Sequence, residues 1–147
     1  MRNIVDFTEI EAYVARVWQG QRCILKPFFF NADFAGFAAS GLETQTIKIN
    51  SNADFLIVEN RVAGAHVVQS YANCSLQITD GATLEQFFSA PVPLPDVCTV
   101  QGKYKQSMAV PRRVAGNSLL TIAASENTGA NAVAAFQLSL VGVLVFT

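Results

Sequence analysis

VAAFQLSLVGVLVFT, residues 133–147, is the most informative segment of the chain. Its Phe and Leu residues fall on one parity, whereas Gln137 and Ser139 fall on the other. Alternation with a period of two places one set of side chains on one face of a pleated strand. The run is also shorter than the roughly 20 apolar residues that a membrane-spanning helix needs. It therefore predicts a long strand within a sheet and no membrane span.

Shorter strand-like runs fill most of the chain before this segment. The predicted strands are 22–30, 44–50, 52–60, 62–71, 74–79, 83–89 and 117–125, with strand fragments and a long loop in 97–116. Turn residues lie between several of them, at 50–52, at Glu59-Asn60 and at Asp80-Gly81. The proline-rich stretch 91–96 cannot be a central strand, because proline cannot donate to a ladder. The last two runs, 117–125 and 133–147, are expected to form a closing hairpin.

About eight strands without alternating helices predict an all-β fold, either an antiparallel β-sandwich or a barrel. A jelly roll is the most specific expectation, because its eight-stranded double sheet fits the strand count. An immunoglobulin-like sandwich would place a tryptophan between two cysteines, but Trp18 precedes all three cysteines. We expect a single β-sandwich domain over residues 21–147 and a short helix or arm over residues 1–20.

Residues 8–19 are the candidate helix. Their apolar residues have the spacing of a single helical stripe: Ile10, Tyr13, Val14, Val17 and Trp18. Thr8 and Glu11 fit a capping box, and Gly20 is placed to end the helix. The same β-branched and aromatic residues also suit an extended arm. The sequence leaves open whether this segment packs on its own sheet or reaches a neighbouring molecule.

The chain has 147 residues, of which 51% are hydrophobic and only 14% charged, against about 25% charged in typical globular proteins. A domain of this length folds without a metal or a disulfide, because it buries roughly 68–70% of its unfolded surface. The low charge predicts apolar surface that a partner covers, and copies of the same chain are the expected partner. An ordinary Phe-rich monomer is the alternative. The net charge of −1 argues against nucleic acid and anionic membranes as partners.

Residues that carry chemistry are sparse. His66 is the only histidine, and no spacing of His, Cys, Asp or Glu predicts a metal site. Cys23, Cys74 and Cys98 form no CxxC pair and are expected to be free, buried thiols of a protein made in a reducing cytosol, with one disulfide as the alternative. No nucleophile or phosphate-binding motif occurs. We expect no enzyme, no catalytic residue and no cofactor; a β-sandwich enzyme with dispersed carboxylates is the weakest alternative.

One segment has an uneven charge, because residues 97–125 contain basic side chains and no acidic residue. Arginine and lysine side chains there could bind an acidic protein surface. The segment could instead line a saccharide or nucleic-acid groove, or be a solvated basic loop. The candidate contacts to a partner are Lys103, Tyr104, Lys105, Arg112, Arg113 and Trp18.

Eleven phenylalanines include adjacent rings at 28–30 and 87–88. Adjacent residues of a strand point to opposite faces, so these runs predict rings both inside and outside the sheet. The outer rings would be covered by the N-terminal helix or by a neighbouring subunit, and most of the others would form the core.

Four segments of the chain together resemble a known family. They are TIKINSNADFLI, CSLQITDGATLEQFFSAPVPL, VPRRVAGNSLLTIAASENTG and AAFQLSLVGVLVF, within residues 42–147. This series of strands, with a DF turn and a proline-rich crossing, resembles the jelly-roll capsid decoration (cement) proteins of tailed bacteriophages. The resemblance implies a virion structural protein, made in the host cytoplasm, that binds the outer capsid surface between capsomers as a homotrimer. The implied partner is the major capsid protein, whose expanded shell it would hold against the pressure of the packaged DNA.

A carbohydrate- or receptor-binding jelly roll, as on a phage fibre or tail, is the second function that the sequence leaves open. Such a module would use Tyr104, Trp18 or exposed phenylalanine rings as platforms for sugars. Glycan binding by the isolated protein would favour this second function, and its absence would disfavour it.

Overall fold

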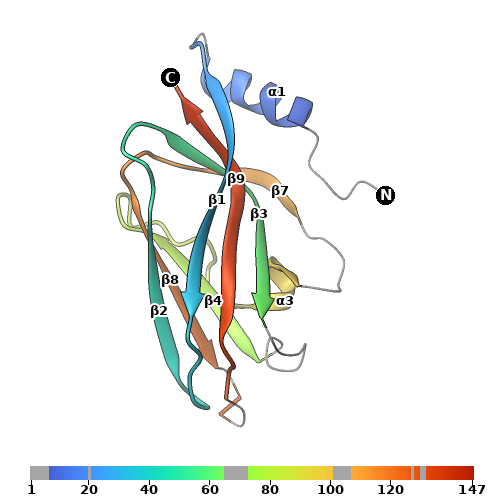
Figure 1. Cartoon of the computed structure of the whole chain (residues 1–147), viewed down its shortest axis with the longest axis vertical. Helices are drawn as coiled ribbons and strands as arrows, with labels where there is room; N and C mark the ends of the chain where they lie inside the picture. Colours follow the sequence, from blue (N-terminus) through green and yellow to red (C-terminus); the bar gives the residue numbers. More distant parts are fainter. Residues whose placement is uncertain (1–6, 20, 65–72, 101–106, 127, 130–131) are drawn as a thin grey trace.

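Two packed β-sheets and an N-terminal helix form the part of the chain that the structure describes (Figure 1). The computed structural model describes residues 7–19, 21–64, 73–100, 107–126, 128–129 and 132–147. In chain order the elements are α1 (Phe7–Val17), β1 (Ile24–Phe34), β2 (Leu42–Lys48), β3 (Asp54–Gly64), β4 (Cys74–Asp80), β5 (Val92–Pro93), α3 (Leu94–Val97), β6 (Thr99–Val100), β7 (Ser107–Val114), β8 (Leu119–Glu126) and β9 (Phe136–Phe146). Within these residues, no helix has the length and apolar character needed to cross a bilayer.

The chain pairs with itself like a long hairpin that has been rolled up. β1 pairs antiparallel with β9, β2 with β8, β3 with β7, and β4 with β5. Pairing of β9 with β3 and of β8 with β4 joins these pairs into two sheets. One sheet has the order β1-β9-β3, with β6 and β7 both beside β3, and the other has the order β2-β8-β4-β5. A double sheet formed by rolling up paired strands is a jelly roll, so the expected all-β sandwich of jelly-roll type is confirmed.

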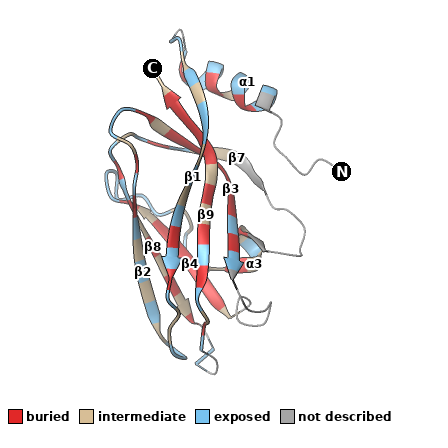
Figure 2. Cartoon of the chain, viewed as in Figure 1, coloured by how far each residue is buried: buried red, intermediate tan, exposed pale blue. Residues whose placement is uncertain are grey.

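Alternating residues of the strands fill the space between the two sheets (Figure 2). In β8, Leu120 and Ile122 are buried while the residues between them are only partly covered. The same alternation in β9 buries Leu138, Leu140 and Leu144. The predicted period of two in the terminal segment is thus confirmed for the side chains that face the core.

Helix α1 packs on the outer face of the β1-β9-β3 sheet. A second, smaller core there contains buried side chains from α1, from the residue directly after it, and from β3 and β9: Ile10, Val14, Trp18, Leu56, Val58, Val143 and Val145. Of the two arrangements left open for this segment, packing on its own sheet is the one observed. The helix begins at Phe7, so Thr8 lies in its first turn and not at the cap where the sequence placed it.

The closing hairpin predicted from 117–125 and 133–147 is wrong. β8 and β9 belong to different sheets, and the connection between them crosses from one sheet to the other. Each of these strands already has a neighbour on both sides, β2 and β4 for β8, and β1 and β3 for β9. Alternation identified the faces of both strands correctly but carried no information about which strands pair.

The turn predicted at Glu59-Asn60 is also wrong, because β3 runs through it as one strand. An irregularity in the register between Ile57 and Glu59 accommodates the polar pair without ending the strand. Both side chains are buried and bonded: Glu59 accepts two hydrogen bonds from Arg61, at 3.1 and 3.3 Å, and the Asn60 amide donates to the carbonyl of Val97 at 3.5 Å. The second half of the run predicted at 62–71 lies outside the described residues.

Residues 83–89 do not form the predicted strand. They form turns and bends beside β4, with a single bridge between Thr79 and Gln86. Leu84 has a φ of 60°, which no strand accommodates. The side chain of Gln77 takes the place of a ladder by bonding the backbone of Phe88, accepting from its N–H at 3.2 Å and donating to its carbonyl at 2.7 Å.

Gly142 of β9 lies beside the irregular stretch of β3, where the two backbones approach closely. A Cβ atom at this position would lie 2.0 Å from the carbonyl oxygen of Leu56 and 3.1 Å from the ring of Phe55. We expect Gly142→Ala to lower the free energy of unfolding by about 1–3 kcal/mol or more, because the sheet backbone must shift. Chemical denaturation measures this loss, and Val141→Ala, at the neighbouring partly exposed position, should cost less. A Gly142→Ala protein as stable as the wild type would contradict this pairing of β3 with β9.

Candidate functional site

The structure describes three of the six predicted contact residues. Arg112 and Arg113 lie next to each other on β7, and Trp18 lies directly after α1. Lys103, Tyr104 and Lys105 lie outside the described residues, as does His66. The structure brings Trp18 and Arg113 together although they are far apart in the sequence.

Arg113 connects β7 to both β3 and the end of α1. Its guanidinium donates to Oδ2 of Asp54 from Nη2 at 2.8 Å and from Nε at 3.2 Å. The same guanidinium lies over the ring of Trp18, with Cζ 4.2 Å from the ring centroid. Oδ1 of Asp54 accepts a further bond from the backbone N–H of Gly116 at 2.8 Å. The ion pair is therefore part of a small network that fixes the end of β7.

Arg112 points the opposite way and connects β7 to the segment that flanks the other sheet. Its Nη2 lies 2.8 Å from Oε1 of Glu85, and its Cζ lies 3.9 Å from the centroid of Phe87, whose ring packs against the main core. Opposite directions for neighbouring residues follow from the pleat of a strand. Beside them, the hydroxyl of Tyr13 in α1 donates to the carbonyl of Pro111 at 3.2 Å. Three consecutive residues of β7 thus join α1, β3 and the 85–87 segment.

Both arginines form ion pairs with carboxylates of the same chain, Arg112 with Glu85 and Arg113 with Asp54, so both contribute to the fold. Trp18 is 4% exposed, and its Nε1 has no acceptor within the described part of the chain. Its ring is covered by Arg113 and offers no open face to a sugar. Contact of these three residues with a partner stays a prediction.

A second cluster, which the sequence analysis did not single out, lies at the opposite end of the sandwich around Glu126. Its carboxylate accepts backbone N–H bonds from Ser40 at 2.8 Å, Thr128 at 2.8 Å and Gly129 at 2.7 Å, and also a bond from the Thr128 hydroxyl. The Thr128 hydroxyl and the backbone donors stabilise the ionised form and lower the pKa of Glu126 to about 2. Glu126 thereby fixes the β1–β2 connection to the β8–β9 connection.

Glu43 has a similar role beside this cluster. It accepts bonds from the backbone N–H groups of Ala35 at 2.9 Å and Gly36 at 3.1 Å. Asp80, at the turn after β4, is likewise a local backbone acceptor, because its Oδ1 accepts from the N–H of Ala82 at 2.9 Å. Glu126 is an acidic residue directly after a predicted strand and is followed by small and polar residues. This pattern could have predicted that its carboxylate binds backbone N–H groups of a turn.

The three cysteines are free, as expected, but only Cys74 and Cys98 are buried. The prediction of a buried thiol is wrong for Cys23, which is partly exposed at the start of the chain segment leading into β1. Burial raises the pKa of Cys74 to about 12 and also raises the pKa of Cys98. Both thiols are protonated at neutral pH, which makes them poor nucleophiles and poor metal ligands. Among the described residues, no group of three His, Cys, Asp or Glu side chains could hold a metal ion.

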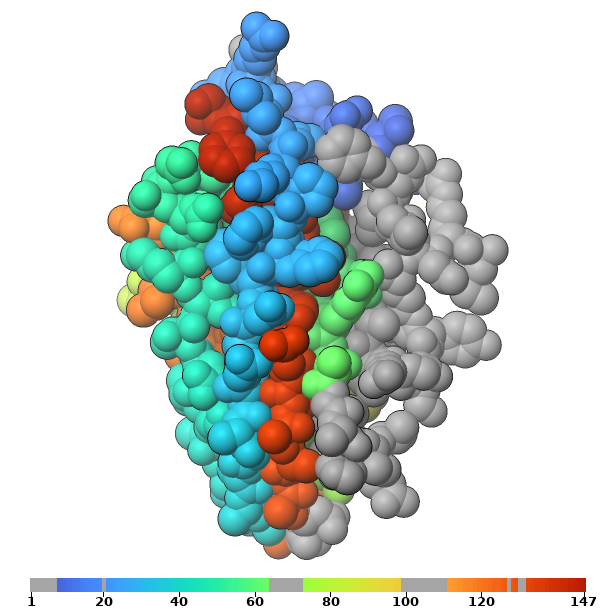
Figure 3. Space-filling view, viewed as in Figure 1, coloured from blue at the N-terminus to red at the C-terminus, as the bar shows by residue number. Residues whose placement is uncertain are grey.

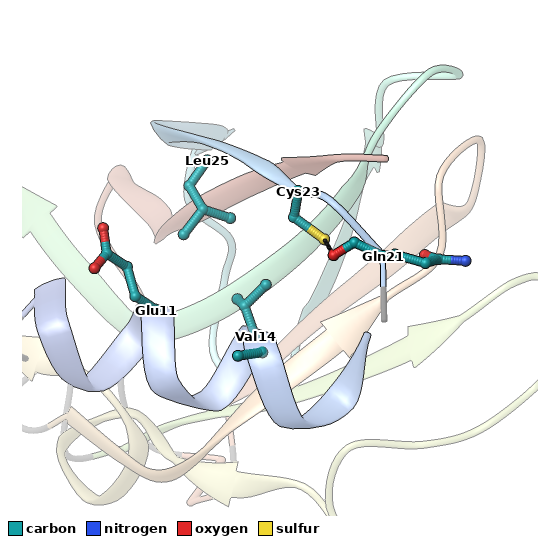
Figure 4. A pocket seen from close by; sticks show the side chains of 6 residues that line it. Glu11, Val14, Gln21, Cys23 and Leu25 are labelled. Atoms are coloured by element: carbon teal, nitrogen blue, oxygen red, sulfur yellow. Dashed lines mark hydrogen bonds between the residues drawn. The ribbon is translucent and has the colours of Figure 1, made fainter. Parts of the chain in front are cut away.

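A cleft of about 330 Å³ lies between α1 and the start of β1 (Figure 4). Its lining residues are Glu11, Val14, Ala15, Gln21, Cys23 and Leu25. The thiol of Cys23 points to the carbonyl of Gln21, 3.7 Å away. With a single carboxylate and a single thiol, the cleft lacks a convergent set of polar groups for a reaction.

Adjacent phenylalanines point to opposite sides of β1, as the sequence predicts. Phe28 and Phe30 pack against the main core, whereas Phe29 is 56% exposed on the outer face. Helix α1 covers the outer face elsewhere but leaves this ring open to solvent. Other large apolar side chains with high exposure are Ile24, Leu42, Leu84 and Leu119.

Replacing Arg113 should loosen the attachment of α1. We expect Arg113→Ala to cost about 1–2 kcal/mol of unfolding free energy, because an exposed ion pair and a cation–π contact are lost together. Trp18 is the only tryptophan, so its fluorescence emission should shift to longer wavelength. Arg113→Lys keeps the charge but loses the planar group that stacks on Trp18. Its stability and Trp18 emission should therefore lie between those of the wild type and Arg113→Ala. Unchanged stability and emission in Arg113→Ala would contradict the role of this contact.

The Glu126 cluster should make stability depend on acid pH. The pKa of Glu126 lies near 2 in the folded protein and near 4.5 when the chain is unfolded. The stabilisation that the ionised Glu126 gives to the folded state is therefore fully present above pH 4.5. That contribution is lost as the pH falls from about 4.5 to about 2. In Glu126→Gln the loss of stability over this window should be smaller than in the wild type, as measured by thermal unfolding at a series of pH values. Parallel curves for the two proteins would contradict the assignment.

Comparisons with known proteins do not assign the chain to a family. A scan against protein-family models finds no match, and neither does a search of the curated proteins. The function proposed below therefore rests on the residues and the fold of the chain itself.

Proposed function

We propose that the chain is a virion structural protein, a capsid decoration protein that binds the outer shell of a tailed-phage head as a homotrimer. Its partners are the major capsid protein and two further copies of itself, and its location is the capsid surface. The jelly-roll architecture and the resemblance of residues 42–147 to such proteins support the proposal. The proposal includes no cofactor and no enzymatic reaction.

The main structural support for this proposal is the side of the sandwich formed by β1 and β2, which we call the open side. Among the strands that the structure describes, β1 and β2 are the terminal strands of their sheets, so each has one edge that none of these strands covers. The two most exposed apolar side chains of these strands are Ile24 at 69% and Leu42 at 65%. Long edge strands with exposed apolar side chains favour association, and a protein built into an assembly has them covered by its neighbours.

Attachment to an acidic shell surface is the proposed role of the basic segment that contains Lys103 and Lys105. Arg112 and Arg113 are already paired with Glu85 and Asp54, so reversing their charge would disturb the fold as well as any contact. Lys103→Glu with Lys105→Glu is therefore the sharper variant for shell binding. Its loss of binding should depend on salt, since contacts between exposed charges are screened.

Native mass spectrometry at micromolar concentration tests the self-association. We expect a trimer for the wild type, and weakened association when Ile24→Glu and Leu42→Glu place charges on the open side. Leu84→Glu is the matched control, because Leu84 is 79% exposed but lies beside β4 on the other side of the sandwich. The trimer should also co-sediment with capsid shells assembled from the major capsid protein of the same virus.

A monomeric wild type at these concentrations that does not bind shells would overturn the proposal. The alternative, a monomeric carbohydrate- or receptor-binding module of a fibre or tail, would then be favoured. A trimer that does not co-sediment with shells would support the proposed self-association and contradict the proposed capsid role.

A further inference from the structure

A flat array of side chains lies on the outer face of the β1-β9-β3 sheet, beyond the part covered by α1. The strand register aligns it in three rows across β1, β9 and β3: Phe29–Val141–Glu59, Asn31–Ser139–Arg61 and Asp33–Gln137–Ala63. We name these nine residues the outer-face grid. Neighbouring strands are about 4.8 Å apart and alternate residues roughly 6.6 Å apart, so the grid spans roughly 10 by 13 Å.

Most of the grid is open to solvent. Figure 3 looks onto this face, where β1, β9 and β3 lie side by side in blue, red and green. Phe29, Asn31, Asp33 and Gln137 are all exposed. Glu59, at 2% exposed, is the buried member. The exposed part therefore presents one phenyl ring followed by polar groups along β1.

Hydrogen bonds within the grid hold its polar side chains in place. Nε2 of Gln137 donates to Oδ1 of Asp33 at 2.7 Å, and the hydroxyl of Ser139 donates to Oδ1 of Asn31 at 2.7 Å. Within the described residues, these bonds leave the Nδ2 donors of Asn31, Oε1 of Gln137 and Oδ2 of Asp33 without a partner. The grid thus offers both donors and acceptors whose positions are fixed before any ligand arrives.

We propose that the outer-face grid binds a saccharide, with Phe29 as the stacking platform and Asn31, Asp33 and Gln137 as hydrogen-bonding groups. A sugar ring has an apolar C–H face and a rim of hydroxyls that each donate and accept. An aromatic ring beside fixed amide and carboxylate groups matches both features. Because the side chains are already held by one another, less rotamer freedom is lost on binding. This activity goes beyond shell attachment, which does not require it.

Two other ligand classes fit the grid less well. Nucleic acid binding depends on cations that meet phosphates, and Arg61, the one cation of the grid, is paired with Glu59 at 3.1 Å. A second protein copy would need several apolar anchors at the centre of the interface, whereas the grid has a single exposed ring among polar side chains.

A glycan array probed with the labelled full-length protein tests the proposal. The probe is a set of purified bacterial surface oligosaccharides, and isothermal titration then measures the affinity for the strongest binder. Phe29→Ala and Asn31→Ala should each weaken binding about tenfold or more, since a stacking platform or a fixed hydrogen-bonding group is lost. Leu84→Ala, which removes an exposed apolar side chain outside the grid, should bind like the wild type.

Trp18 emission verifies that each variant remains folded, because Trp18 lies under α1 and away from the grid. Absence of binding to every oligosaccharide by the folded wild type would overturn the proposal. Binding that survives both Phe29→Ala and Asn31→Ala would place the sugar elsewhere and overturn the site. Neither result depends on whether the protein binds capsid shells, so the capsid role and the saccharide site are tested separately.

Discussion

Strand β9 is hydrogen-bonded along both of its edges, and this pairing positions most of the other elements. β9 pairs with β1 over Phe136–Phe146 on one side and with β3 on the other. One of its faces closes the main core, and the end of its other face, at Val143 and Val145, forms the floor on which α1 packs. The positions of α1, of the open strand β1 and of the outer-face grid all follow from this one strand.

Strand β7 is also joined to the neighbouring elements by the charged side chains of two arginines. Arg113 joins it to Trp18 and Asp54, and Arg112 joins it to Glu85 and Phe87. Side chains that would be obvious candidates for binding a partner are thereby used to hold the fold together. On the described part of the chain, apolar and hydrogen-bonding side chains remain exposed on the open side at β1 and β2 and on the outer face of β1 and β9. This division lets a chain with few charged residues keep its helix attached while those side chains stay exposed.

The fold class could be predicted from the sequence because burial between two sheets leaves an apolar residue at every second position. Ile47 and Ile49, which alternate within the run predicted as a strand at 44–50, are both buried. Pairing could not be predicted in this way, since the pattern that marks β8 and β9 as strands contains nothing about their neighbours. The strand through Glu59-Asn60 was missed because the bonds of its buried polar groups, from Arg61 to Glu59 and from the Asn60 amide to the Val97 carbonyl, are visible only in three dimensions. The outer-face grid could not be predicted for the same reason. Its rows depend on the register between strands that are far apart in the sequence.

Under the proposed function a tailed phage encodes this chain, and electron cryo-microscopy of its mature particles is the most direct test. We predict jelly-roll density on the outer surface of the head, in groups of three copies, with the side that carries β1 and β2 covered by a neighbour. Heads whose outer surface lacks this density, in particles that contain the protein in the tail or not at all, would contradict it.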